Sequence, residues 1–169
     1  MKGRMPRVVE ARRFCVAVEV GQKAPDFTLP SDSWDNEVSL EDERREGPVV
    51  LFFYPGDWSS VCTDQMGQLQ QEIERFEEKG AKVLGVSVDS PWSHKAWAEE
   101  RGIEFPLLSD FQREVVEDYG VKHEAGFPER AYFVIDEEGV VRAKKIEDSP
   151  SDRPEVEDVL EDLEKALRQ

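Results

Sequence analysis

A predicted strand passes into a predicted helix through Phe52-Phe53-Tyr54-Pro55-Gly56-Asp57-Trp58-Ser59-Ser60-Val61-Cys62-Thr63-Asp64-Gln65. The apolar beginning is typical of a buried strand, and the proline and glycine that follow indicate a loop. The loop brings Cys62 to the first turn of the helix. There the unpaired backbone N–H groups and the positive end of the helix dipole favour a thiolate over a thiol. Because the thiolate is the nucleophilic form of cysteine, this segment predicts a reactive sulfur.

Strand and helix patterns alternate on both sides of this segment. Continuous apolar runs indicate strands buried on both faces, and apolar residues at offsets of three and four indicate amphipathic helices. The patterns predict strands or extended pieces over 24–29, 37–40, 48–54, 82–89 and 105–108, helices over 62–80, 90–102, 113–119 and 156–167, and a hairpin over 131–145. Strands that alternate with helices, followed by a hairpin and a last helix, imply a layered α/β domain.

The length of the chain favours one domain. A chain of 169 residues, 38% of them apolar, can bury a core without disulfides or metal. We interpret residues 1–17 as an N-terminal arm and residues 18–169 as a single domain. The arm is basic, but its apolar run over 14–18 is too short for a convincing secretion signal, so we expect a cytoplasmic protein. No apolar run approaches the roughly 20 residues of a membrane span.

The net charge of −16 limits the possible partners. Phosphate groups of nucleic acids and anionic membrane surfaces would be repelled, so we expect neither as a partner. The charge is typical of a solvated acidic surface. Adaptation to a salty cytoplasm would produce the same composition, and the sequence leaves this alternative open.

The two cysteines do not form a disulfide framework or a metal site. Ser59 stands where a Cys-x-x-Cys oxidoreductase would have the partner thiol of Cys62. Cys15, Cys62, His94 and His123 show no ligand-pair spacing, so we expect no metal, and the sequence indicates no cofactor. A papain-like hydrolase is not favoured, because neither histidine lies near a recognisable partner motif. We expect both histidines on the surface or in loops.

The residues around Cys62 closely resemble the active-site signature of the peroxiredoxin family. That signature is a proline, three residues, a threonine or serine, two residues and the reactive cysteine. Pro55, Ser59 and Cys62 match it, with serine in place of the commoner threonine. Arg130 occupies the place of an arginine that members of the family keep near the sulfur, and Ala24-Pro25-Asp26-Phe27 looks like the family's entry segment. The resemblance covers about residues 20–168.

Within this AhpC/TSA superfamily, the chain most resembles the alkyl hydroperoxide reductase E type. The similar segments are His94-Lys95-Ala96-Trp97 and Phe105-Pro106-Leu107-Leu108-Ser109-Asp110-Phe111. The resemblance implies a thioredoxin fold, with a central mixed β-sheet flanked by helices and an N-terminal extension. It also implies a thiol-dependent peroxidase, and a homodimer or a larger homo-oligomer. Trp92 and Trp97 are expected to pack rather than to contact peroxide.

The resemblance also implies roles for three residues. Cys62 would attack the O–O bond of hydrogen peroxide or an alkyl hydroperoxide and become a sulfenic acid. Arg130 would stabilise the thiolate and the negative charge that develops on the oxygens. The Ser59 hydroxyl can accept from and donate to those oxygens. From the residues alone, Arg130 could instead form a surface salt bridge and Ser59 could be only a helix cap.

Three more residues are expected at the site. The backbone N–H of Val61, next to that of Cys62, would bind the peroxide oxygens. Pro55 has no N–H and would shield the sulfur from water. Gln65 falls where the family often has an acidic or amide residue near the site.

The recycling step depends on the second cysteine. Gly67 stands where one class of the family has its resolving cysteine, and the only other cysteine is Cys15, in the arm. We therefore expect a one-cysteine mechanism, in which a small thiol or a thioredoxin-like protein reduces the sulfenic acid. A resolving role for Cys15 stays open. So does an alternative function, in which Cys62 oxidation switches a redox-sensing or chaperone-like protein. A catalytically silent binding module is not favoured.

Overall fold

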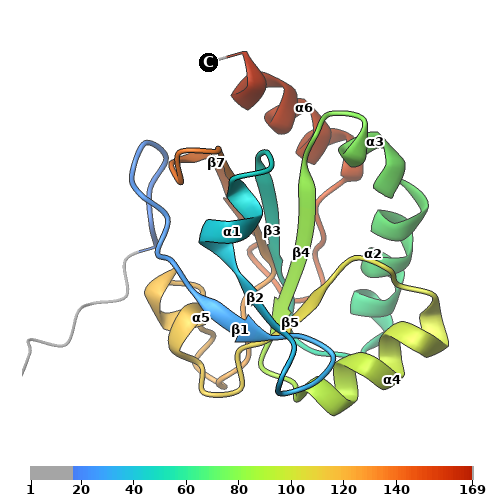
Figure 1. The fold of residues 1–169 in the computed structure, drawn as a ribbon. Coiled ribbons are helices and arrows are strands. Elements are labelled where there is room, and N and C mark those ends of the chain that lie inside the picture. The colour runs from blue at the N-terminus through green and yellow to red at the C-terminus, as the bar shows by residue number, and fades with distance from the viewer. Residues whose placement is uncertain (1–16, 169) are drawn as a thin grey trace, which may run out of the picture.

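The centre of the molecule is a mixed five-stranded sheet (Figure 1). The computed structural model describes residues 17–168. In spatial order the strands are β5 (Leu107–Ser109), β4 (Lys82–Ser87), β3 (Val49–Phe53), β6 (Ala131–Ile135) and β7 (Val141–Ile146). β3, β4 and β5 are parallel, whereas β6 is antiparallel to both β3 and β7. The mixed sheet and the hairpin between β6 and β7 confirm the prediction.

A small second sheet precedes the central one. It pairs β1 (Thr28–Pro30) with β2 (Glu37–Ser39) in antiparallel register. A short helix that the sequence did not predict, α1 (Leu40–Arg44), follows directly. The Ser39 side chain caps it by accepting a hydrogen bond from the backbone N–H of Asp42. With only five residues, α1 has too little apolar periodicity to be recognised.

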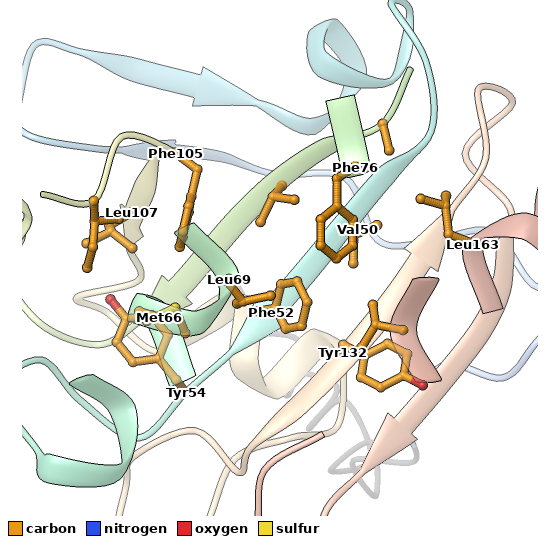
Figure 2. Packing of buried hydrophobic residues seen from close by; sticks show 14 of the residues in the cluster. Val50, Phe52, Tyr54, Met66, Leu69, Phe76, Phe105, Leu107, Tyr132 and Leu163 are labelled. Carbon is orange, nitrogen blue, oxygen red and sulfur yellow. The ribbon is translucent and has the colours of Figure 1, made fainter. Parts of the chain in front are cut away.

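Helices cover both faces of the central sheet. The remaining helices are α2 (Ser60–Gln71), α3 (Ile73–Glu77), α4 (Pro91–Arg101), α5 (Glu114–Asp118) and α6 (Val156–Leu167). α2, α3 and α6 pack on the face formed by Val50, Phe52 and Tyr54 (Figure 2), and α4 contributes Trp97 to the same core. α1 and α5 pack on the opposite face, together with Phe27. Successive residues of β3 thus face opposite cores, and both faces of the strand are buried. For this reason the strand appears in the sequence as a continuous apolar run.

One predicted helix is divided in two. The helix expected over 62–80 forms α2 and α3, because the backbone at Glu72 has φ −101° and ψ 8°, outside the helical range. Leu69 of α2 and Phe76 of α3 are nevertheless both buried in the same core. The apolar spacing is therefore correct for both helices, although it does not reveal the break. By contrast, α4 has the predicted ends, with a Ser90 cap and Gly102 in the left-handed conformation.

The predicted arm falls almost entirely outside the described residues. Residues 1–16, including Cys15, are not described. The boundary between arm and domain therefore stays a prediction. Among residues 17–168, no helix combines the length and the apolar character that a membrane span requires.

Candidate active site

Cys62 lies in the first turn of α2, as predicted. Ser59 is the N-cap of this helix, and its Oγ accepts a hydrogen bond of 3.2 Å from the backbone N–H of Cys62. The Ser59 side chain is exposed, whereas Cys62 is 0% exposed. The loop thus reaches the surface, but the sulfur itself is covered.

The register of the sheet brings Arg130 to the sulfur. β3 ends at Phe53, which pairs with Ala131 at the start of antiparallel β6. Arg130 precedes Ala131, so it lies at the edge of the sheet from which the chain continues to Cys62. Its Nη2 donates a hydrogen bond of 3.1 Å to Cys62 Sγ. Arg130 is only 2% exposed and is therefore not a surface salt-bridge residue.

Neutral groups hold the guanidinium in place. Nε and Nη2 of Arg130 donate to the carbonyl oxygen of Pro150, at 3.2 and 3.0 Å. Nη1 donates to Oε1 of Gln65, which is buried one turn after Cys62 in α2. Within residues 17–168, every acceptor of Arg130 is thus a neutral oxygen or the sulfur. The guanidinium is therefore buried without a carboxylate partner among the described residues, and the sulfur of Cys62 is its remaining partner.

The other predicted site residues lie on the same loop and helix. Pro55 is half-buried between β3 and α2. Val61 is the second residue of α2, where a backbone N–H has no acceptor within its own helix. Gln65 accepts from Arg130 through Oε1, whereas its buried Nε2 has no hydrogen-bond partner in the described structure. Nε2 can therefore donate a further hydrogen bond. The structure brings Arg130 into direct contact with both Cys62 and Gln65, and Ser59 into contact with the backbone of Cys62.

A buried polar cluster next to this loop was missed by the sequence reasoning. It contains Asp57, Asp89 and His94, whose candidate ligand atoms lie within 4.8 Å of one another. His94 is 1% exposed, so the expectation of a surface or loop position was wrong for this residue. Asp57 and Asp89 follow β3 and β4, and the carboxyl ends of neighbouring parallel strands meet at one edge of a sheet. The place of each aspartate directly after a predicted strand could have indicated that the two carboxylates lie close together.

Trp92 and Trp97 both pack against other side chains, as expected. Trp97 is fully buried in the core, whereas Trp92 is 69% exposed. Trp92 packs edge-on against Trp34, and Trp34 packs in the same way against Phe111. These three aromatic residues form an exposed apolar cluster. His123 is stacked on Phe127 in a turn, in agreement with its predicted place in a loop.

Fold and site together define a class of protein. A cysteine at a helix N-terminus beside a buried arginine, on a mixed sheet flanked by helices, is suited to thiol-based redox chemistry. Comparisons with known proteins make the class specific. The AhpC/TSA family profile matches residues 20–144, and the chain belongs to this family.

Curated relatives and solved structures agree with this membership. The chain is 40% identical to a chloroplastic 2-cysteine peroxiredoxin of Chattonella marina var. antiqua, over 75% of this chain and 70% of the relative. It is 39% identical to alkyl hydroperoxide reductase E of Mycobacterium bovis, over 74% of this chain and 83% of the relative.

The solved structures show the same likeness in three dimensions. Reduced 2-Cys peroxiredoxin of Plasmodium vivax matches with a TM-score of 0.82 and 29% identity, over 89% of this chain and 83% of the other. Peroxidoxin BcpB of Mycobacterium tuberculosis matches with a TM-score of 0.79 and 30% identity, over 90% and 99%. The fold is therefore the thioredoxin fold of peroxiredoxins, and the chain is a thiol-dependent peroxidase, an oxidoreductase.

Proposed function

We propose that the chain reduces hydrogen peroxide and organic hydroperoxides by a one-cysteine mechanism. The Cys62 thiolate attacks one peroxide oxygen, an S–O bond forms and the O–O bond breaks. The second oxygen takes a proton and leaves as water or an alcohol, and Cys62 becomes a sulfenic acid. The contact between Arg130 and Sγ carries this proposal, because a buried cation without a carboxylate partner supports a thiolate there.

The neighbouring groups complete the reaction site. Arg130 stabilises negative charge on the leaving oxygen as the O–O bond lengthens. The Ser59 hydroxyl and the Val61 N–H bind the peroxide oxygens, and Pro55 limits the entry of water. Gln65 holds the guanidinium through Oε1, and its free Nε2–H can donate a further hydrogen bond to the bound peroxide.

The sulfenic acid is recycled by an external thiol. A first thiol attacks the sulfur and releases water, which leaves a mixed disulfide, and a second thiol then restores Cys62 and leaves as the oxidised disulfide. A small thiol or a thioredoxin-like protein would serve as this reductant. Support comes from Gly67, which occupies a position where one class of the family has its resolving cysteine.

Two measurements test the mechanism. Cys62→Ser should abolish peroxide consumption with every thiol reductant tried, whereas Cys15→Ser should retain it. After excess peroxide without reductant, intact-mass spectrometry should show two or three added oxygen atoms at Cys62. A disulfide mass that lacks two hydrogens would instead assign the resolving role to Cys15. Consumption that stops after one equivalent, although thiol is present, would favour the redox-sensing alternative.

We also propose that the protein forms a homodimer or a larger homo-oligomer. The exposed cluster of Trp34, Trp92 and Phe111 supports an association of two copies, because large apolar side chains grouped on a surface mark interaction sites. Light scattering coupled to size exclusion should give at least twice the mass of the chain, and Trp92→Glu should reduce it. A monomeric wild-type protein would contradict the proposal. The cytoplasmic location remains a proposal from the sequence.

A further inference from the structure

Two carboxylates hold the loop that precedes Cys62, and the first is the side chain of Asp57 itself. The side chain of Asp57 is completely buried. Its Oδ1 accepts a hydrogen bond of 2.7 Å from the hydroxyl of Tyr54, at the end of β3. Its Oδ2 accepts one of 2.9 Å from Ser93 and lies 2.7 Å from His94 Nδ1, both on α4. Asp57 thus joins the loop to two separate elements.

Both ring nitrogens of His94 have a hydrogen-bond partner. Nε2 is 3.0 Å from the carbonyl oxygen of Leu108, which can only accept, so Nε2 carries a hydrogen. Nδ1 lies 2.7 Å from Oδ2 of Asp57, so a hydrogen bond joins the two side chains in a buried environment.

A second carboxylate holds the backbone of the same residue. Oδ2 of Asp89 accepts a hydrogen bond of 2.8 Å from the backbone N–H of Asp57 and one of 2.6 Å from Ser87. Burial raises the pKa of Asp89, and the nearby charge of Asp57 acts in the same direction. The cluster that could suit a metal ion is thus internally hydrogen-bonded, with both ring nitrogens of His94 in use.

The next residue shows what this fastening maintains. Trp58 has φ +69°, a left-handed conformation that non-glycine residues seldom adopt. A residue in such a conformation persists only where its surroundings determine it. Trp58 is followed by Ser59, whose Oγ caps α2 at the N–H of Cys62. The position of Asp57 therefore determines, through the backbone of Trp58, where Ser59 caps the helix and where Cys62 lies.

We propose that Asp57 and His94 are positioning residues for the peroxidase reaction, which hold the 55–59 loop so that Cys62 stays enclosed and faces Arg130. Neither residue contacts the sulfur, so both act through the loop. The inference rests on the proposed function, because it assigns the loop's geometry to the reaction of Cys62 with peroxide. Release of the loop should have two opposite effects. Peroxide reduction should slow, while the fully buried sulfur should become easier for a larger reagent to reach.

The experiment measures both effects in the same variants. Asp57→Ala and His94→Phe should lower the second-order rate constant with hydrogen peroxide about 10-fold, since small displacements of reacting groups cost one to two orders of magnitude. Alkylation of Cys62 by N-ethylmaleimide in the native protein should become several-fold faster. Asp57→Asn should retain most of both properties, because its amide oxygen can accept from Tyr54 and its amide nitrogen can donate to His94.

A matched control separates positioning from loss of stability. Leu163→Ala removes a buried side chain from α6, so it destabilises the fold without touching the loop. It should leave both rates unchanged, and urea unfolding should show that it is at least as destabilised as Asp57→Ala. Equal changes in Leu163→Ala and Asp57→Ala, or no change in Asp57→Ala, would overturn the proposal. If Asp57→Ala fails to fold, His94→Phe and His94→Gln carry the same test, with Asp57→Asn as the conservative control.

The two proposals fail in different ways. Absence of peroxide consumption in the wild-type protein would reject the proposed function. The alkylation rates would still decide whether Asp57 and His94 hold the loop, because they need no peroxide.

Discussion

At the scale of residues, the site is a buried charge whose partner is a sulfur. Arginine keeps its proton at any pH at which the protein is folded. Arg130 makes its hydrogen bonds within residues 17–168 to Pro150, Gln65 and Cys62, and none of the oxygens is charged. In the proposed reaction, the Cys62 thiolate balances a cation that would be costly to bury alone.

Replacing the arginine should remove most of the activity. Arg130→Met keeps the length of the side chain but loses the donors to the sulfur and to the leaving oxygen. We expect kcat/KM for hydrogen peroxide to fall about 100-fold, as when a preorganised donor is removed from a charge-stabilising site. Stopped-flow kinetics provide the measurement. Arg45→Met, at an exposed position, is the control, and a loss of less than threefold in Arg130→Met would contradict the assigned role.

The hydroxyl that caps α2 has a second role to test. Ser59→Ala should cost about 1 kcal/mol of stability through the lost cap. It should also lower kcat/KM by more than that loss explains, because a hydroxyl bound to peroxide is removed too. Ser59→Thr keeps the hydroxyl and should retain activity. The comparison needs urea unfolding and peroxide kinetics on both variants, and full activity in Ser59→Ala would limit Ser59 to capping.

At the scale of elements, the register of β3 and β6 assembles the site. Cys62 and Arg130 are far apart in the chain, but the pairing of Phe53 with Ala131 brings the end of one strand to the beginning of the other. At the opposite edge of the sheet, tight turns bring the start of β3 close to the start of its other neighbour, β4. Gly47, just before β3, has φ +152°, and a Cβ there would lie 2.1 Å from the carbonyl oxygen of Gly80.

Two glycine substitutions should have opposite effects on stability. Gly47→Ala forces the Cβ against a backbone oxygen in an unfavourable conformation, so we expect a loss of at least about 2 kcal/mol. Gly67→Ala, inside α2, meets nothing within 4 Å and should raise stability by about 0.5–1 kcal/mol through helix propensity. Chemical denaturation gives both free energies of unfolding. An unchanged free energy of unfolding in Gly47→Ala would mean that the turns at Gly47 and Gly80 can move apart at little cost.

At the scale of the whole molecule, two cores enclose the sheet and bury every tyrosine of the chain. Tyr54 and Tyr132 belong to the core under α2 and α6, and Tyr119 belongs to the core on the opposite face. The chain has three tyrosines in total. Burial raises the pKa of each above its usual value near 10, and Asp57 and Asp162 add to the effect at Tyr54 and Tyr132. The ionisation of the tyrosine hydroxyls therefore indicates whether both cores remain packed.

The protein should lose stability in alkali as a consequence. Above pH 10 the unfolded chain releases phenolic protons that the folded chain keeps, so stability falls as pH rises. Three tyrosines give a slope of up to about 4 kcal/mol per pH unit. Phenolate absorbance near 295 nm should appear together with the loss of circular dichroism. Phenolate that forms near pH 10 in a protein with native circular dichroism would contradict the burial of these side chains.

Most strands and helices could be predicted because their signals are local. The apolar run of β3, the Ser90 cap with Gly102 in α4, and the place of Cys62 behind a cap residue all depend on neighbours within a few positions. Arg130 could be placed only by resemblance to a family, since nothing in its own surroundings distinguishes it from a surface arginine. The break at Glu72 and the exposure of Trp92 had no local signal.

Contacts between distant segments belonged to the tertiary structure. Cys62 meets Arg130 across 68 positions, and Asp57 meets His94 across 37. Whether such side chains touch depends on strand order and register, which arise from packing of the complete sheet. Packing also buries these side chains. Arg130 therefore serves as a buried partner of the sulfur, and His94 as a buried hydrogen-bond partner of Asp57. Periodicity and helix capping depend on residues that are neighbours in the sequence. The balance of charges inside the core depends on the packed sheet and helices, because only packing brings the paired groups together and buries them.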